Sequence, residues 1–152
     1  MRKDWYRQAM LAALVAMAGC GAPQQDRAAM PLFPNETPEL RAQIEATAER
    51  HDVPVALVQR VVVRESTHRP QARNGPYYGL MQILPQTART MGYRGPPEGL
   101  LDAETNLEYG VKYLRGAYLV ADGDHDRAVQ WYARGYYYEA RDRGMLEETG
   151  LR

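Results

Sequence analysis

The stretch 55–88 constrains the fold most, because it opens with a clear helical pattern that then stops sharply. The helix is expected to begin near Pro54, and its apolar stripe consists of Leu57, Val58, Val61 and Val62. Glu65 follows Val61 by four residues and Val62 by three, which places its carboxyl on or beside the apolar face. Pro70 prevents the helix from continuing much further. The pattern therefore predicts an acid at the rim of a packed core.

An acid in that position has a chemical consequence. A carboxyl on an apolar face loses hydration, which favours its neutral form and raises its pKa, as a general acid requires. The residues alone leave a second interpretation equally open. Glu65 could instead turn to solvent or pair with Arg64 or Arg69.

Several short motifs follow this acid in order. Glu65–Ser66 is a Glu-Ser pair, residues 79–83 read Gly-Leu-Met-Gln-Ile, and residues 85–88 read Pro-Gln-Thr-Ala. Residues 106–114 contain the pattern Asn-x-x-x-Gly-x-x-Tyr-Leu. Together these motifs resemble the catalytic domain of the soluble lytic murein transglycosylases, the goose-type lysozyme-like family. The resemblance covers roughly residues 39–145.

The resemblance implies an all-α, lysozyme-like single domain of the transglycosylase SLT type, with Glu65 at the floor of a cleft. The helical periods fit about six or seven helices, and no strand pattern of useful length occurs. The implied reaction is cleavage of the β-1,4 bond between N-acetylmuramic acid (MurNAc) and N-acetylglucosamine (GlcNAc) in peptidoglycan, without water as nucleophile. Glu65 would protonate the leaving oxygen and then take the proton of the C6 hydroxyl, closing a 1,6-anhydro ring. No cofactor is implied.

The resemblance also implies substrate contacts for four further residues. Gln82 would make a polar contact to a sugar acetamido group, and Met81 would form an apolar wall. Asn74 falls near a position where relatives carry a serine close to the acid. Tyr132 could hydrogen-bond the catalytic carboxyl or a sugar, in a segment where Ala133 replaces the family asparagine. Without the resemblance, Gln82 would be a capping amide and Met81 a core residue.

Two other function classes stay open. Hydrolysis by a goose-type lysozyme-like muramidase would need a second acid about 5 to 9.5 Å from the first. The candidates, none of them in a distinctive motif, are Asp102, Glu104, Glu108 and Glu139. A noncatalytic, lipid-tethered peptidoglycan-binding protein is supported by the altered segment at Tyr132 and Ala133. Intact Glu65 and Gln82 argue against that alternative.

The N-terminus predicts export. Residues 1–19 have a basic start, an apolar run at residues 9–18 and small residues before Cys20, as in a signal peptide. The run is shorter than the about 20 residues that span a bilayer. Residues 17–20 resemble a lipobox, in which Cys20 carries a lipid, although Met17 replaces the usual leucine and leaves simple secretion open. We expect a periplasmic protein anchored to the outer membrane, with residues 20–36 as a flexible tether and residues 37–152 as the catalytic domain.

Composition limits the partners. Nineteen basic and nineteen acidic residues give a net charge of zero, which removes the electrostatic case for nucleic acid. The only cysteine excludes an intramolecular disulfide. His51, His68 and His125 lack metal-ligand spacing, so we expect no metal site. The expected partners are peptidoglycan glycan strands and, through the lipid, a membrane; we expect a monomer.

The remaining elements follow from caps and periodicity. Thr37 and Pro38 predict the start of a helix that ends near His51. Asp102 is expected to cap a long helix that ends near Ala121, and residues 122–126 are expected to form a turn and a helix cap. Further helices are expected at residues 86–91, 127–135 and 136–145, and loops at residues 71–78 and 93–101.

Overall fold

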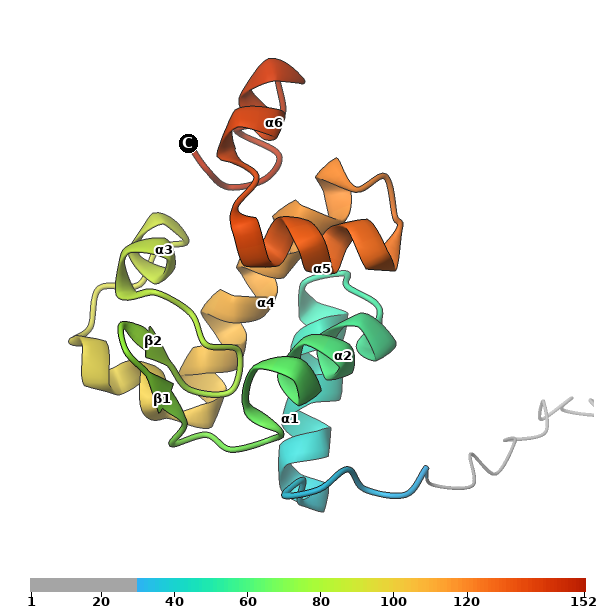
Figure 1. The fold of residues 1–152 in the computed structure, drawn as a ribbon, viewed down its shortest axis with the longest axis vertical. Helices are drawn as coiled ribbons and strands as arrows, with labels where there is room; N and C mark the ends of the chain where they lie inside the picture. Colours follow the sequence, from blue (N-terminus) through green and yellow to red (C-terminus); the bar gives the residue numbers. More distant parts are fainter. Residues whose placement is uncertain (1–29) are drawn as a thin grey trace, which may run out of the picture. The chain divides into compact units, whose positions relative to one another are not determined.

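The structure, a computed structural model, describes residues 30–152. The expected signal peptide, Cys20 and most of the expected tether lie outside the described residues. Residues 31–152 form one compact unit. Its helices, shown in Figure 1, are α1 (Pro38–Arg50), α2 (Val55–Ser66), α3 (Pro85–Thr90), α4 (Ala103–Val120), α5 (His125–Arg134) and α6 (Tyr137–Asp142), with a 3₁₀ helix η1 (Pro97–Leu101). The helical fold class is confirmed.

Polar caps set where the principal helices begin. The Thr37 hydroxyl accepts a hydrogen bond from the Leu40 N–H at 3.2 Å, so α1 starts as predicted. Asp102 accepts from the Thr105 N–H at 2.8 Å and caps α4. Asp124 caps α5 in the same way, within the predicted turn. These helix starts are therefore fixed by local sequence.

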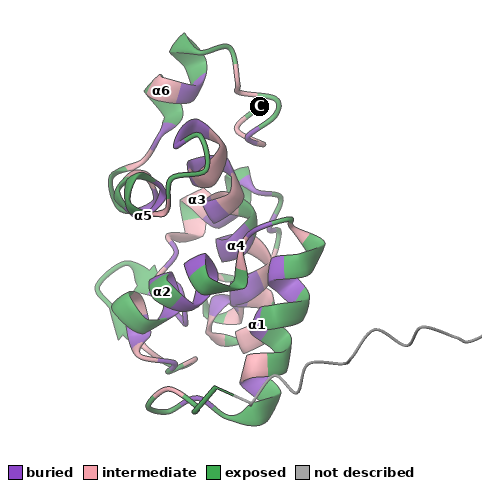
Figure 2. Cartoon of the chain, turned by 90° about the vertical axis from the view of Figure 1, so that its right-hand side faces the viewer, coloured by how far each residue is buried: buried purple, intermediate pink, exposed green. Residues whose placement is uncertain are grey.

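The main core forms around α4, which packs against α1, α3, η1 and α5. Helix α2 contributes Leu57, Val58, Val61 and Val62, all fully buried, which is the apolar stripe expected from the sequence. Figure 2 shows buried residues along the inner faces of α2 and α4, with exposed residues on the outer face of α1. A smaller cluster under the hairpin and η1 consists of Tyr78, Ile83, Ala88, Tyr93 and Leu100.

The expected loop at residues 71–78 contains a short hairpin. Strand β1 (Arg73–Asn74) pairs antiparallel with β2 (Tyr77–Tyr78), with Asn74 opposite Tyr77. Each strand has two residues, too few to show an alternating pattern. Similarly, the expected loop at residues 93–101 ends in η1, where Pro97 occupies the first turn.

The expected tether is shorter than the sequence suggested. Its last residues, 31–36, belong to the compact unit, and Glu36 is only 7% exposed. Composition indicated a linker because residues 21–34 are rich in Pro, Gln, Ala and Gly with no period, but long-range contacts hold residues 31–36 on the domain.

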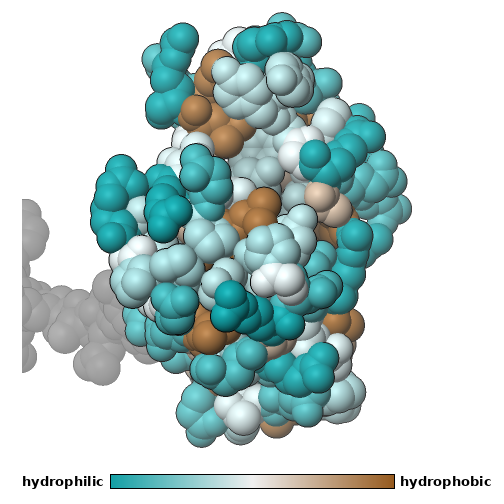
Figure 3. Space-filling view, turned by 60° about the vertical axis from the view of Figure 1, so that its left-hand side comes forward, coloured by the Kyte–Doolittle hydropathy of each residue, from teal (hydrophilic) through white to brown (hydrophobic). Residues whose placement is uncertain are grey.

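The surface carries no large apolar face in the view of Figure 3, where hydrophobic side chains form small separate patches among hydrophilic ones. Among the described residues, no helix is long and apolar enough to cross a membrane.

Candidate active site

Glu65 lies in the last turn of α2, at the edge of the main core. Its side chain is 21% exposed, so it is neither in open solvent nor sealed. The helix ends directly after it, because Thr67 adopts a left-handed conformation with φ 52° and its N–H bonds back to the carbonyls of Val62 and Val63. The end of α2 thus presents the carboxyl at a boundary between core and surface.

The surroundings of Glu65 favour its neutral form. Desolvation raises the pKa of Glu65, and the nearby Arg64 opposes this shift in part. The Arg64 guanidinium is half exposed and approaches the carboxyl at 3.5 Å. Within residues 30–152 the carboxyl accepts no hydrogen bond. Burial without donors is the condition for a carboxylic acid that keeps its proton toward neutral pH.

Glu65, Asn74 and Gln82 line one open cavity of about 730 Å³. Asn74 comes from β1 and Gln82 from the turn after β2, so both predicted contacts lie on the hairpin side of the cavity. The cavity wall also contains four residues that were not predicted as substrate contacts: Asn35, His68, Arg69 and Arg73. Among the described residues that line it, Glu65 is the only acid.

Gln82 is held in a defined orientation. Its backbone has φ 46°, and its side-chain amide nitrogen donates to the carbonyls of Gly79 at 2.8 Å and Ala72 at 3.1 Å. These bonds use the amide N–H groups and leave Oε1 as the end that can accept from a ligand. Gln82 therefore both fastens the loop and keeps an acceptor for a donor such as an acetamido N–H.

The packing of Asn106 explains why residue 79, just before this turn, is a glycine. The buried Asn106 side chain donates to the carbonyls of Tyr78 and Leu100 and accepts from the Met81 N–H at 2.8 Å. Gly79 has φ 72°, and a Cβ there would collide with Asn106 and the Leu100 carbonyl. Gly79 and Asn106, which come from two separate motifs, thus pack directly against each other, and the Asn106 bonds hold the loop that carries Gln82.

Met81 and Tyr132 lie behind the cavity. The Met81 side chain is fully buried in the main core, which corrects its expected role as an apolar wall. The Tyr132 hydroxyl donates to the Met81 carbonyl at 2.8 Å, and the structure gives it no bond to the Glu65 carboxyl. Burial raises the pKa of Tyr132 well above its usual value, and the negative charge of Glu65 adds to the shift. Tyr132 is therefore close enough to influence Glu65 while bonded elsewhere.

The candidates for a second acid do not line the Glu65 cavity. Asp102 caps α4, and Glu108 pairs with Arg50 at 3.3 Å and His51 at 3.0 Å. Among the described residues, no group of three or more potential ligands could hold a metal ion. The arrangement offers one carboxyl for proton transfer.

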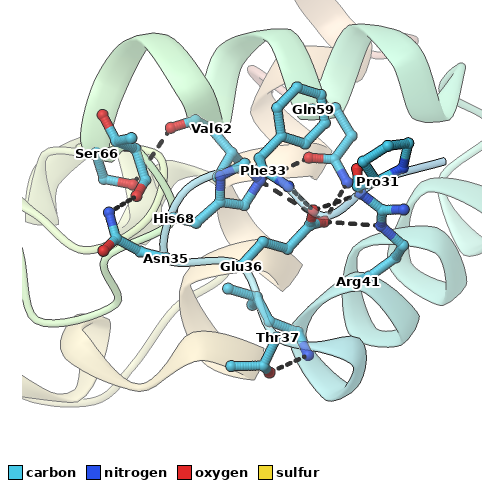
Figure 4. A network of polar contacts seen from close by, with 12 residues as sticks. Pro31, Phe33, Asn35, Glu36, Thr37, Arg41, Gln59, Val62, Ser66 and His68 are labelled. Carbon is cyan, nitrogen blue, oxygen red and sulfur yellow. Dashed lines mark hydrogen bonds and ion pairs between the residues drawn. The ribbon is translucent and has the colours of Figure 1, made fainter.

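The polar residues behind Glu65 were missed by sequence reasoning. Figure 4 shows Glu36, Gln59 and His68 joined in a buried network with Arg41. The only local signal was Gln59, a polar residue beside the apolar stripe of α2. Glu36 gave no signal, because it precedes the first predicted helix.

The transglycosylase SLT domain family matches residues 42–144. The matched region contains Glu65, Gln82, Asn106 and Tyr132, and of the cavity wall only Asn35 lies outside it.

Proposed function

Because this chain belongs to the transglycosylase SLT domain family, we propose that it cleaves the β-1,4 bond between MurNAc and GlcNAc in peptidoglycan and leaves 1,6-anhydro-MurNAc ends. Members of this family are lytic transglycosylases that act on peptidoglycan. The observation that carries the finer proposal is that Glu65 is the only acid among the described residues of the cavity wall, with a raised pKa. A single carboxyl suffices for a reaction in which water is not the nucleophile.

The proposed reaction uses the Glu65 carboxyl twice. Protonated Glu65 donates its proton to the glycosidic oxygen as the bond from that oxygen to C1 of MurNAc breaks. The acetamido oxygen of the substrate stabilises the positive charge at C1. The C6 hydroxyl of the same sugar then bonds to C1, and the Glu65 carboxylate accepts the hydroxyl proton. The acid returns to its starting state and no water is consumed.

Gln82 and Asn74 are the proposed sugar contacts. The Oε1 atom of Gln82 can accept from an acetamido N–H, because its amide nitrogen is already bonded within the loop. Asn74 is exposed on the facing hairpin and carries both a donor and an acceptor.

The experiment that tests this proposal is mass analysis of the products released from purified sacculi. Anhydro-muropeptides are the expected product, and Glu65→Gln is expected to release none above background. Products with reducing ends would instead establish hydrolysis, and absence of release by the wild type would favour the noncatalytic binding protein.

We propose that the mature protein is a periplasmic lipoprotein, anchored to the outer membrane through Cys20, and a monomer. The support is the layout of residues 1–20, with a basic start, an apolar run and small residues before the cysteine. Cys20→Ser should move the protein from the membrane fraction to the soluble fraction or leave it unprocessed. Unchanged fractionation and lipid labelling would contradict the lipid anchor.

A further inference from the structure

The helix end that carries Glu65 is held in an unusual conformation. Two consecutive residues after the helix, Thr67 and His68, are left-handed, with φ of 52° and 58°. This region is unfavourable for residues with a Cβ, and more so for a β-branched threonine. Such a conformation persists only where surrounding contacts impose it. The position of Glu65, two residues earlier, depends on those contacts.

Residues 31–37, which we call the N-terminal strap, supply several of them. The Asn35 side chain donates to the Thr67 carbonyl at 3.0 Å. The Phe33 ring stacks on the His68 imidazole, with ring centres 5.2 Å apart and planes 14° from parallel. Figure 4 shows the strap residues lying against the end of α2. The strap therefore contacts both left-handed residues directly.

Glu36 fastens the strap to two helices. Its buried carboxylate accepts from Arg41 of α1 at 2.6 Å, from Gln59 of α2 at 2.7 Å and from the Phe33 N–H at 2.9 Å. Burial opposes its ionisation, but the bonds from these three donors outweigh burial and hold the pKa of Glu36 at about 2. Glu36 is thus a carboxylate throughout the ordinary pH range.

This carboxylate also fixes the state of His68. The Gln59 amide nitrogen donates to Glu36, so its Oε1 must accept, and His68 Nε2 lies 2.7 Å from it. His68 therefore carries its proton on Nε2 and donates it to Gln59. Nδ1 is buried and has no hydrogen-bond partner among the described residues. Burial lowers the pKa of His68, which keeps the ring neutral. The hydrogen bonds then all point one way, since His68 donates to Gln59 and Gln59 donates to Glu36.

We propose that Glu36, acting through Gln59 and His68, is a positioning residue for Glu65. The chain of bonds clamps the left-handed end of α2 and so fixes the Glu65 carboxyl at the cavity. Glu36 does not touch the substrate. This inference rests on the proposed function only for its activity test.

The first experiment compares Glu36→Ala and Glu36→Gln with the matched control Glu108→Gln. Glu108 also pairs with an arginine and a histidine, but at α4 and away from the cavity. With folding verified by circular dichroism, Glu36→Ala should lower kcat on sacculi about 10- to 100-fold with KM changed less than about twofold, as expected for a displaced catalytic group. Glu36→Gln keeps the size and one acceptor and should recover part of that loss. Glu108→Gln should keep kcat within about twofold of wild type.

The second experiment needs no substrate. A carbon-13 NMR titration of the Glu65 carboxyl should show a pKa in Glu36→Ala that is lower than in Glu36→Gln, because both variants lose the Glu36 charge and only the alanine loosens the helix end and admits water. Arg64, the charged group among the described residues that shifts the Glu65 pKa, is unchanged in both variants. If the wild type released no product, the proposed function would fail, and this titration would still decide the positioning role.

Asn35→Gly provides a milder variant in case Glu36→Ala does not fold. Glycine accepts the left-handed Asn35 backbone, which has φ 63°, and removes the donor to Thr67 together with an amide at the cavity wall, so KM is measured beside kcat. It should lower kcat about two- to tenfold. The inference is overturned if folded Glu36 and Asn35 variants keep wild-type kcat and an unchanged Glu65 pKa, or if Glu108→Gln loses as much activity as they do.

Discussion

Two glutamates close to the end of α2 meet opposite surroundings. The side chain of Glu36 is fully buried and that of Glu65 is 21% exposed, so both are mostly removed from water. Glu36 accepts bonds from Arg41, Gln59 and the Phe33 N–H, and its pKa is about 2. In the described part of the chain, the partner of Glu65 is the half-exposed Arg64 at 3.5 Å, and the pKa of Glu65 is raised.

The difference shows that burial alone does not decide the charge of an acid. Desolvation raises the pKa of both carboxyls, and for Glu36 the hydrogen bonds reverse the result. The more deeply buried acid is therefore the stronger one. Donors make Glu36 a permanent anion that ties elements together, and their absence leaves Glu65 able to hold and return a proton.

The sharpest test of this contrast is Glu65→Gln. The amide keeps size and polarity but transfers no proton, so activity on sacculi should fall about 10³- to 10⁴-fold, toward the upper range for general acid catalysis. The measurement is the rate of muropeptide release, with Glu36→Gln as the comparison. A Glu65→Gln rate within about tenfold of wild type would assign the chemistry to another group.

The same variant should not lose stability. The folded state binds the Glu65 proton more tightly than the unfolded state, so stability falls as pH rises from the ordinary glutamate value through the raised pKa. Glu65→Gln removes the ionised form and should raise the free energy of unfolding at neutral pH. Urea denaturation of both proteins at pH 7 measures this, and a clear loss of stability would show that the carboxylate has stabilising partners.

Glu36 should show the opposite dependence on pH. Its pKa falls from 4.5 to about 2 on folding, so its stabilisation is complete above pH 4.5 and is lost as pH falls toward 2. The shift corresponds to about 3 kcal/mol. Urea denaturation between pH 2 and 6 should show that loss in the wild type and a flatter curve in Glu36→Gln. Parallel curves would mean that the pKa of Glu36 is not lowered on folding.

Glu65 and Glu36 also differ in how far sequence reasoning could find them. The environment of Glu65 follows from local spacing, because Val61 and Val62 share its helix face and Pro70 predicts that the helix stops before it. Glu36 is bonded to Gln59, which lies 23 residues away. No local pattern reports such a pairing, so composition assigned these residues to a linker.

The cavity shows the same division between local and distant information. The apolar stripe and the family resemblance pointed to Glu65, the resemblance alone pointed to Gln82, and folding brings both to one cavity. For Met81 the resemblance implied an apolar wall, whereas its residue type alone favoured the core, where it lies. The caps at Thr37 and Asp102 were predictable because each bond spans only three residues.

Tyr132→Phe tests whether the surroundings of Glu65 are apolar or depend on a polar partner. The variant removes the bond to the Met81 carbonyl and leaves that buried acceptor unsatisfied, so the free energy of unfolding should fall by about 1 to 3 kcal/mol. Activity at a temperature below unfolding should change much less than in Glu65→Gln. A loss of activity comparable to that of Glu65→Gln in the folded variant would show that the phenol bonds the carboxyl or the substrate during the reaction.

The smallest expected effect concerns Arg64, which within residues 30–152 is the charge that opposes the raised pKa of Glu65. Because the protonated form is active, the rate should fall on the alkaline side of the pH profile as Glu65 ionises. Arg64→Gln removes the charge that favours the carboxylate, so the pKa of Glu65 rises and the alkaline limb moves to higher pH. Salt should move the wild-type limb in the same direction, because it screens an exposed pair.

Arg60 provides a matched control for this last variant, since it lies one turn earlier on α2, is equally exposed and pairs with Asp126 at 2.6 Å. Arg60→Gln removes the same charge from the same helix and should leave the limb in place. If Arg60→Gln moved the limb as far as Arg64→Gln, the effect would reflect net charge alone. If neither variant moved it, the limb would belong to a group other than Glu65, and the contrast with Glu36 would no longer explain the chemistry.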